Sequence, residues 1–104
     1  MTIEELKDAL ETTGYPVAIG FFERPPNLPY IVINPQSSSN SSADDMTYGK
    51  ASDYDVELYT NRRRNAIAEE NVEQVLDDKM LFYDSNEDYI DTERLYRKTY
   101  SLNF

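Results

Sequence analysis

The sequence contains neither cysteine nor histidine among its 104 residues. Without cysteine the chain has no disulfides and no thiolate ligands for a metal. Without histidine it lacks the commonest general base, the commonest zinc ligand and the base of a serine triad. Its glycines are Gly14, Gly20 and Gly49 alone, which leaves no glycine-rich loop for a phosphate. We therefore predict that the protein is not an enzyme and that it has no catalytic residues, cofactor or metal.

The charge of the chain is strongly one-sided, with 20 acidic residues, 10 basic residues and a formal net charge of −10. A field of this sign repels phosphates, so we expect no specific binding of nucleic acid. No apolar run approaches the roughly 20 residues that a membrane helix needs. Residues 1–5 show neither the basic start nor the apolar stretch of a signal peptide. We expect a cytosolic protein that makes no contact with membranes.

The first third of the chain predicts one helix and two strands. Thr2 and Glu5 form a capping box ahead of apolar residues at helical spacing, which predicts a helix over about residues 2–12. Two short apolar stretches, 17–22 and 28–33, are rich in residues that favour strands. Because about five residues join them, we predict a hairpin at the centre of a sheet.

Residues 54–60 have the clearest strand pattern in the sequence, because their side chains alternate without a break. Successive side chains leave a pleated strand on opposite faces of the sheet. We therefore predict a half-buried strand with Tyr54, Val56 and Leu58 toward the core. The opposite, exposed face then carries a row of acids, which consists of Asp53, Asp55 and Glu57.

The remainder of the chain predicts a second helix and two further strands. Asn61 is a plausible helix cap, and an apolar stripe predicts a helix over about residues 64–78 that packs on the sheet. Strands are expected at 81–83 and 89–102, with a turn around Ser85-Asn86-Glu87. In the last strand a lysine shares its parity with apolar residues, the set being Tyr96, Lys98, Tyr100 and Leu102.

We predict that residues 1–104 form a single domain of the α+β class. It combines an antiparallel sheet of about four to five strands with two helices packed on one face. A polar stretch at about 35–50, with serine at five of the six positions 37–42, cannot bury enough surface to order itself. We predict a flexible loop, and loops of this length are often functional. Its candidate interface residues are Ser38, Ser39, Asn40, Asp44, Asp45 and Tyr48.

The acid row supplies a second candidate interface, through Asp55 and Glu57. Carboxylates spread along one strand do not converge on a cation. The alternative is a solvated face whose acids pair with cations of a neighbouring strand, such as Arg94, Arg97 or Lys98.

A third candidate interface is the basic cluster Arg62, Arg63 and Arg64. Arginines next to a helix start oppose the helix dipole, and a local choice that opposes the fold can mark an interaction site. We expect either an acidic partner surface there or simple solvation, which is usual for exposed arginines.

The segment from Asp84 to Asp88 matches the first ligands of a calcium-binding EF-hand loop. The match then fails, because Tyr89 stands in place of the required glycine and Leu95 in place of the bidentate glutamate. A polar hairpin turn is the better interpretation.

Four segments together resemble small neck proteins of long-tailed phages and prophages, of the tail-terminator or tail-completion type. In that family a strand ending in a Leu-Tyr-Thr-like sequence runs into a helix and then into an aromatic strand pair. The segments that carry the resemblance are 28–32, 54–60, 72–76 and 89–96. The chain departs from the family pattern at 61–65, where an arginine triplet replaces lysine and acidic residues.

The resemblance implies an α+β fold and a homohexameric ring at the head-proximal end of the tail tube. Its partners would be other copies of the chain, the tail-tube protein and the head-completion protein. The protein would assemble in the host cytoplasm and end in the neck of the virion.

The net charge of −10 also suits a different function, that of an acidic inhibitor that mimics DNA and occupies a nucleic-acid-binding host protein. Such mimicry requires carboxylates along an elongated surface, at roughly one charge per 1.7 Å of duplex axis. The acids of residues 53–57 and of the second helix would have to supply them.

Overall fold

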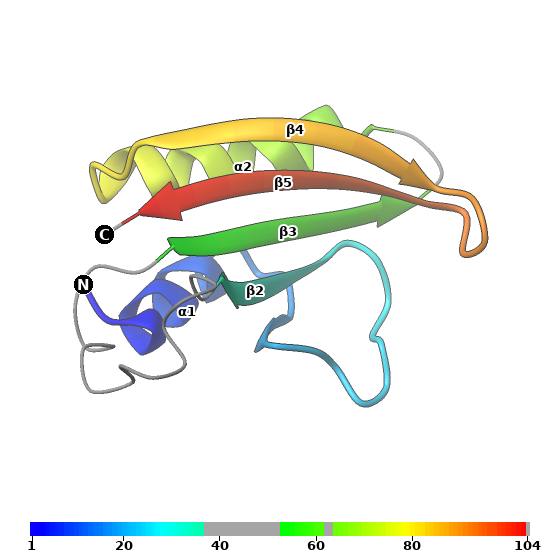
Figure 1. The fold of residues 1–104 in the computed structure, drawn as a ribbon, viewed down its shortest axis with the longest axis horizontal. Coiled ribbons are helices and arrows are strands. Elements are labelled where there is room, and N and C mark those ends of the chain that lie inside the picture. The colour runs from blue at the N-terminus through cyan, green and yellow to red at the C-terminus, as the bar shows by residue number, and fades with distance from the viewer. Residues whose placement is uncertain (37–52, 62–63, 104) are drawn as a thin grey trace.

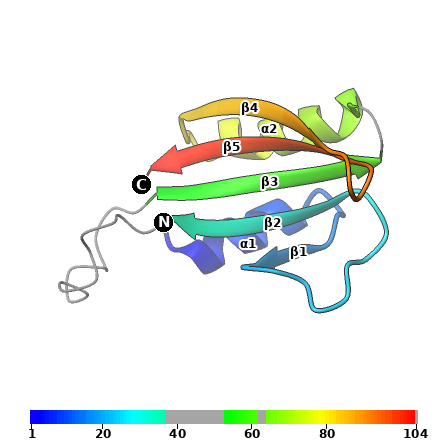
Figure 2. The same cartoon turned by 45° about the vertical axis from the view of Figure 1, so that its right-hand side comes forward.

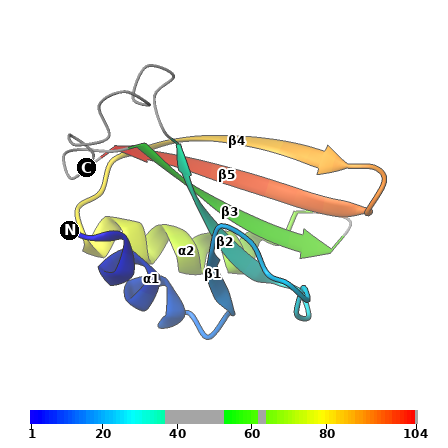
Figure 3. The same ribbon diagram turned by 60° about the horizontal axis from the view of Figure 1, so that its bottom comes forward.

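The computed structural model of the chain describes residues 1–36, 53–61 and 64–103, which form two helices and one five-stranded mixed sheet. The elements in chain order are α1 (Ile3–Glu11), β1 (Val17–Ile19), β2 (Tyr30–Gln36), β3 (Asp53–Asn61), α2 (Ala66–Asp78), β4 (Tyr83–Ile90) and β5 (Leu95–Asn103). The strand order is β1-β2-β3-β5-β4, and both helices lie on the same side of the sheet (Figure 1, Figure 3). The predicted α+β class is confirmed.

The alternating strand predicted from the sequence is β3, the middle strand of the sheet (Figure 2). It pairs antiparallel with β2 on one side and with β5 on the other. Val56 and Leu58 are buried against the helices, and Tyr54 is partly buried beside them. The predicted core face of this strand is therefore correct.

The core lies between the helices and this face of the sheet. Leu6 and Leu10 of α1 and Val72 and Leu76 of α2 have no exposed surface. The strands contribute the other half of the core, with Val17, Ile31, Ile33, Val56, Leu58, Tyr100 and Leu102.

The two helices begin with side-chain caps. The predicted capping box is present at α1, where Thr2 and Glu5 satisfy each other's backbone N–H groups. At α2 the cap is Asn65, whose side chain accepts a hydrogen bond from Ala68 N at 3.1 Å. The predicted cap Asn61 is wrong because β3 continues through that residue. No helix in the described part of the chain is long and apolar enough to cross a membrane.

The predicted central hairpin is also wrong, because β1 and β2 are parallel and β1 is an edge strand. Gly20 ends β1 in a left-handed conformation, with φ of 92°, and its N–H donates to Ile33 O at 2.8 Å. Residues 21–29 then return the chain to the start of β2. A connection of that length allows a parallel pairing, which a tight hairpin turn does not.

A third difference concerns β4, which runs through the predicted turn at Ser85-Asn86-Glu87. The turn lies instead at 91–94, where Arg94 has a left-handed φ of 56°. Most side chains of β4 are exposed, so its sequence shows no alternation of apolar and polar residues. The strand forms because it pairs with β5. Of the loop predicted at 35–50, Pro35 and Gln36 belong to β2, and the rest lies outside the described residues.

Replacement of Leu76 by alanine should destabilise the fold by about 2–5 kcal/mol, because it removes a fully buried side chain and leaves a cavity. Ile67 on the same helix is 71% exposed, so Ile67→Ala should change the free energy of unfolding by less than about 0.5 kcal/mol. Urea denaturation of both variants measures the difference. Equal effects would show that α2 does not pack as described.

Candidate interaction surfaces

The structure places the predicted interface residues in different regions. Asp55 and Glu57 alternate with the core residues Val56 and Leu58, so they lie on the sheet face opposite the helices, which we call the open face. Arg64 lies on the helix side, just before α2. The structure does not bring these two groups together. The other predicted interface residues lie outside the described residues, namely Ser38, Ser39, Asn40, Asp44, Asp45, Tyr48, Arg62 and Arg63.

The acids at the start of β3 bind neutral donors of β5 across the open face. Ser101 Oγ donates to Asp55 at 2.9 Å, and the side-chain amide of Asn103 donates to Asp53. Cross-strand pairs of this kind stabilise a sheet without metal or catalytic chemistry. The expected pairing of these acids with nearby cations is therefore replaced by hydrogen bonds from uncharged side chains.

Glu57, the third acid of the row, is only 8% exposed, so the expectation of an exposed side chain is wrong. The Tyr59 hydroxyl donates to Glu57 Oε1 at 2.9 Å. Tyr30 of β2 stacks on Tyr59 with 5.0 Å between ring centroids, and Phe22 packs edge-on against Tyr30 at 5.3 Å. The connection between β1 and β2 thus brings an aromatic ring to this part of the open face. The alternation of residues along β3 could not reveal that aromatic rings from other segments bury Glu57.

Arg97 pairs with β4 and not with the acid row. Its guanidinium donates two hydrogen bonds to Asp88, at 3.0 and 2.7 Å, in the forked geometry that arginine and carboxylate favour. This pair raises the pKa of Arg97 and lowers the pKa of Asp88. The charge of Arg97 is therefore matched by Asp88.

The EF-hand-like residues Asp84, Asn86 and Asp88 occupy alternate positions of β4. Alternate residues of a strand are about 6.8 Å apart, so their side chains do not surround one cation. Within the described ranges, no group of three or more acidic, histidine or cysteine side chains is placed to hold a metal ion.

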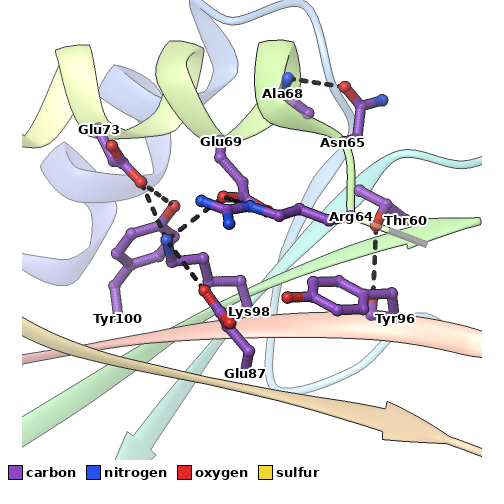
Figure 4. Close-up of polar contacts among 10 residues, drawn as sticks. All are labelled: Thr60, Arg64, Asn65, Ala68, Glu69, Glu73, Glu87, Tyr96, Lys98 and Tyr100. Atoms are coloured by element: carbon purple, nitrogen blue, oxygen red, sulfur yellow. Dashed lines mark hydrogen bonds and ion pairs between the residues drawn. The ribbon is translucent and has the colours of Figure 1, made fainter.

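A cluster of charged side chains lies on the opposite side of the sheet, between β5, β4 and α2, and its two innermost members, Lys98 and Glu69, are buried (Figure 4). Lys98, which is 7% exposed, is its centre. Its Nζ lies 3.3 Å from Glu69 Oε1, 3.3 Å from Glu73 Oε2 and 3.6 Å from Glu87 Oε2. The expected role of Lys98 as a cation for the β3 acids is wrong, because its side chain points to the other face.

Two further donors complete this cluster. Arg64 Nε donates to Glu69 Oε1 at 2.9 Å, and the Tyr100 hydroxyl donates to Glu73 Oε2 at 2.8 Å. Arg64 is thus bound within the chain, although 58% of its side chain is exposed. Glu69 Oε2 is buried and accepts no hydrogen bond from the described residues. The cluster connects α2 to the sheet through charge as well as through apolar contacts.

The surroundings of Lys98 favour its charged form. Burial alone would lower the pKa of Lys98, but hydrogen bonds and ion pairs with Glu69 and Glu73 outweigh it and raise that pKa. A lysine with a raised pKa stays protonated at neutral pH and cannot serve as a nucleophile or base. The sequence contained one signal for this cluster, namely the shared parity of Lys98 with Tyr100 and Leu102.

Comparison with known proteins gives no family for the chain: no protein-family description and no curated protein matches it.

Replacement of Lys98 by methionine should destabilise the fold by about 3 kcal/mol, because it leaves Glu69 buried without its ammonium partner. Lys79→Met is the control, since Lys79 is exposed, and it should cost less than about 0.5 kcal/mol. Urea denaturation at neutral pH compares the two. A Lys98→Met variant as stable as the wild type would show that the cluster is not needed to hold α2.

Stability should also fall in alkaline solution. Burial is the main cause of the raised pKa of Tyr59, to about 12, and of the raised pKa of Tyr100. Both tyrosines and Lys98 hold their protons more tightly in the folded chain. Their contribution is therefore complete below a pH of about 10 and is lost as the pH rises through the folded pKa values.

Urea midpoints between pH values of about 8 and 11.5 measure this loss. Tyr59→Phe should reduce the decline, because phenylalanine does not ionise in the unfolded state. A constant or rising midpoint over this range would contradict the described burial of these tyrosines.

Proposed function

We propose that the protein is a structural component of a phage or prophage head–tail connector, of the tail-terminator type. The observation that supports this best is the one-sided build of the domain. Both helices cover one face of the sheet, and no helix of the described residues covers the other face (Figure 3). A layer of this kind can place its open face and its sheet edge against neighbouring subunits.

The edge formed by β4 is suited to contact with a partner. β4 is the last strand of the sheet and, within the described part of the chain, nothing pairs with its outer side. An unpaired edge of eight residues presents free N–H and C=O groups to another chain. The exposed acids Asp84 and Glu87 give this edge negative charge, which discourages pairing with an identical edge and favours a complementary surface.

Exposed apolar side chains adjoin the same region. Met80 and Phe82, in the connection from α2 to β4, are 84% and 93% exposed. Phe82 also lines a shallow groove with Asp53, Asp84 and Asn103. A large aromatic side chain beside polar groups is typical of a contact that is buried on assembly.

The charge of the chain is consistent with a neck ring. DNA passes through such a ring, and a net charge of −10 keeps the genome from adhering to it. In this proposal the protein assembles in the host cytoplasm, and its partners are further copies of itself, the tail-tube protein and the head-completion protein.

The geometry is less favourable for DNA mimicry. Acids on one face of β3 repeat about every 6.8 Å, whereas each strand of a duplex carries a charge about every 3.4 Å of axis. Moreover, Glu57 is buried and Asp88 is neutralised by Arg97. We therefore favour the assembly function.

Native mass spectrometry and electron microscopy of the protein mixed with the tail-tube protein of the same phage test the proposal. We expect a hexameric ring at one end of tubes of limited length. Phe82→Ser should weaken this association by about tenfold or more, because it removes an apolar anchor from the interface. Ile67→Ser, which changes an exposed apolar residue of α2, is the control and should have no effect.

A protein that remains monomeric alone and with the tube protein, while tube length is unchanged, would contradict the proposed function. Inhibition of a host DNA-binding enzyme by that monomer, and its loss on neutralisation of the β3 acids, would support the inhibitor instead.

A further inference from the structure

A pocket of about 450 Å³ opens on the open face, between the β1–β2 connection and the strands β2, β3 and β5. It is separate from the groove beside Phe82 and from the charged cluster under the sheet. The side chains that give it its chemistry are Phe22, Tyr30, Glu57, Tyr59, Glu93 and Arg97.

The acid within this pocket is largely buried and has one partner within the described part of the chain. Glu57 is 8% exposed, and among the described residues the Tyr59 hydroxyl is its one hydrogen-bond donor. An ionised carboxylate can accept about four hydrogen bonds, and the second oxygen of Glu57 is not among the enclosed, unpaired polar atoms of the described residues, so it is accessible from the pocket. Glu57 therefore has unused capacity to accept hydrogen bonds from a ligand.

Among the described residues, the cation that lines the pocket is Arg97, which interacts with the Tyr59 hydroxyl but forms no ion pair with Glu57. Arg97 forms its two-point contact with Asp88, outside the pocket. Glu93, from the turn between β4 and β5, adds a second carboxylate to the lining. The local charge is thus negative, in keeping with the net charge of −10.

The walls beside Glu57 are aromatic. The rings of Tyr30 and Tyr59 are stacked at 5.0 Å between centroids, and Phe22 meets Tyr30 edge-on. Aromatic faces attract a cation within about 6 Å of the ring centroid, and most strongly where water is excluded. An acid next to aromatic rings suits a side chain with a cationic end and an apolar chain, because the acid pairs with the charge and the rings contact the rest.

We propose that this pocket binds an arginine side chain of a partner protein. A guanidinium group can donate two parallel hydrogen bonds to Glu57 and lie flat on a tyrosine ring, which an ammonium group cannot do. The negative charge of the chain attracts a basic partner over longer distances. The pocket can bind such a side chain whether or not the protein serves in a phage neck.

Titration of the ¹⁵N-labelled full chain with N-acetyl-arginine amide, followed by NMR, tests this assignment. Saturable shifts should appear at Tyr30, Glu57 and Tyr59. Glu57→Gln keeps the side-chain shape and an oxygen acceptor for Tyr59 but removes the charge, so it should weaken binding by about tenfold or more. Glu70→Gln removes an exposed acid of α2, on the other side of the sheet, and should leave binding within about twofold of the wild type.

N-acetyl-citrulline amide, the neutral isostere of the probe, should produce no saturable shift. Phe22→Ala is a second variant that keeps Glu57 and should also weaken binding. The assignment is overturned if the wild type shows no saturable shift, or if Glu57→Gln binds as well as the wild type. Equal shifts around Asp53 and Asp84 would also overturn it, because they would indicate general attraction to acids.

Discussion

The arrangement of this protein depends on one constraint: a sheet has two faces, and the two helices cover only one of them. α1 lies nearer β1 and β2, and α2 lies nearer β4 and β5 (Figure 2). Apolar side chains therefore gather on the helix side, and the open face has to be polar to remain in water. The acids of β3, the Arg97–Asp88 pair and the hydrogen bonds from β5 all follow from that division.

The contact between the helices and the sheet also contains charged side chains. Lys98 stands among buried apolar residues of β5 and contacts three glutamates, Glu69, Glu73 and Glu87. A buried ion pair adds little stability compared with apolar side chains of the same size, but its loss is costly. We infer that the cluster selects one position of α2 along the sheet, because any other position would leave these charges unpaired.

Local sequence patterns predicted the features that depend only on residues close together in the chain. The alternation of β3 and the capping box of α1 are examples, and both are confirmed. The pairing of β1 could not be predicted in this way, because a continuous apolar run fits a parallel or an antiparallel neighbour equally well.

The strand β4 and the buried acid Glu57 were missed for a related reason. β4 is an exposed edge strand, and its structure comes from pairing with β5, from which Lys98 and Arg97 contact Glu87 and Asp88. Glu57 is buried next to aromatic residues that are distant in the sequence. The charged cluster and the aromatic pocket therefore became apparent only once the strands were placed side by side.

In the proposed function, partners bind at the open face and at the edge of β4, and not at the helices. Hydrogen–deuterium exchange, measured on the protein alone and after assembly with the tail-tube protein, tests it most directly. We predict slower exchange in β4 and in the connection between β1 and β2, with little change in α1 and α2. Slower exchange confined to the two helices would contradict the account.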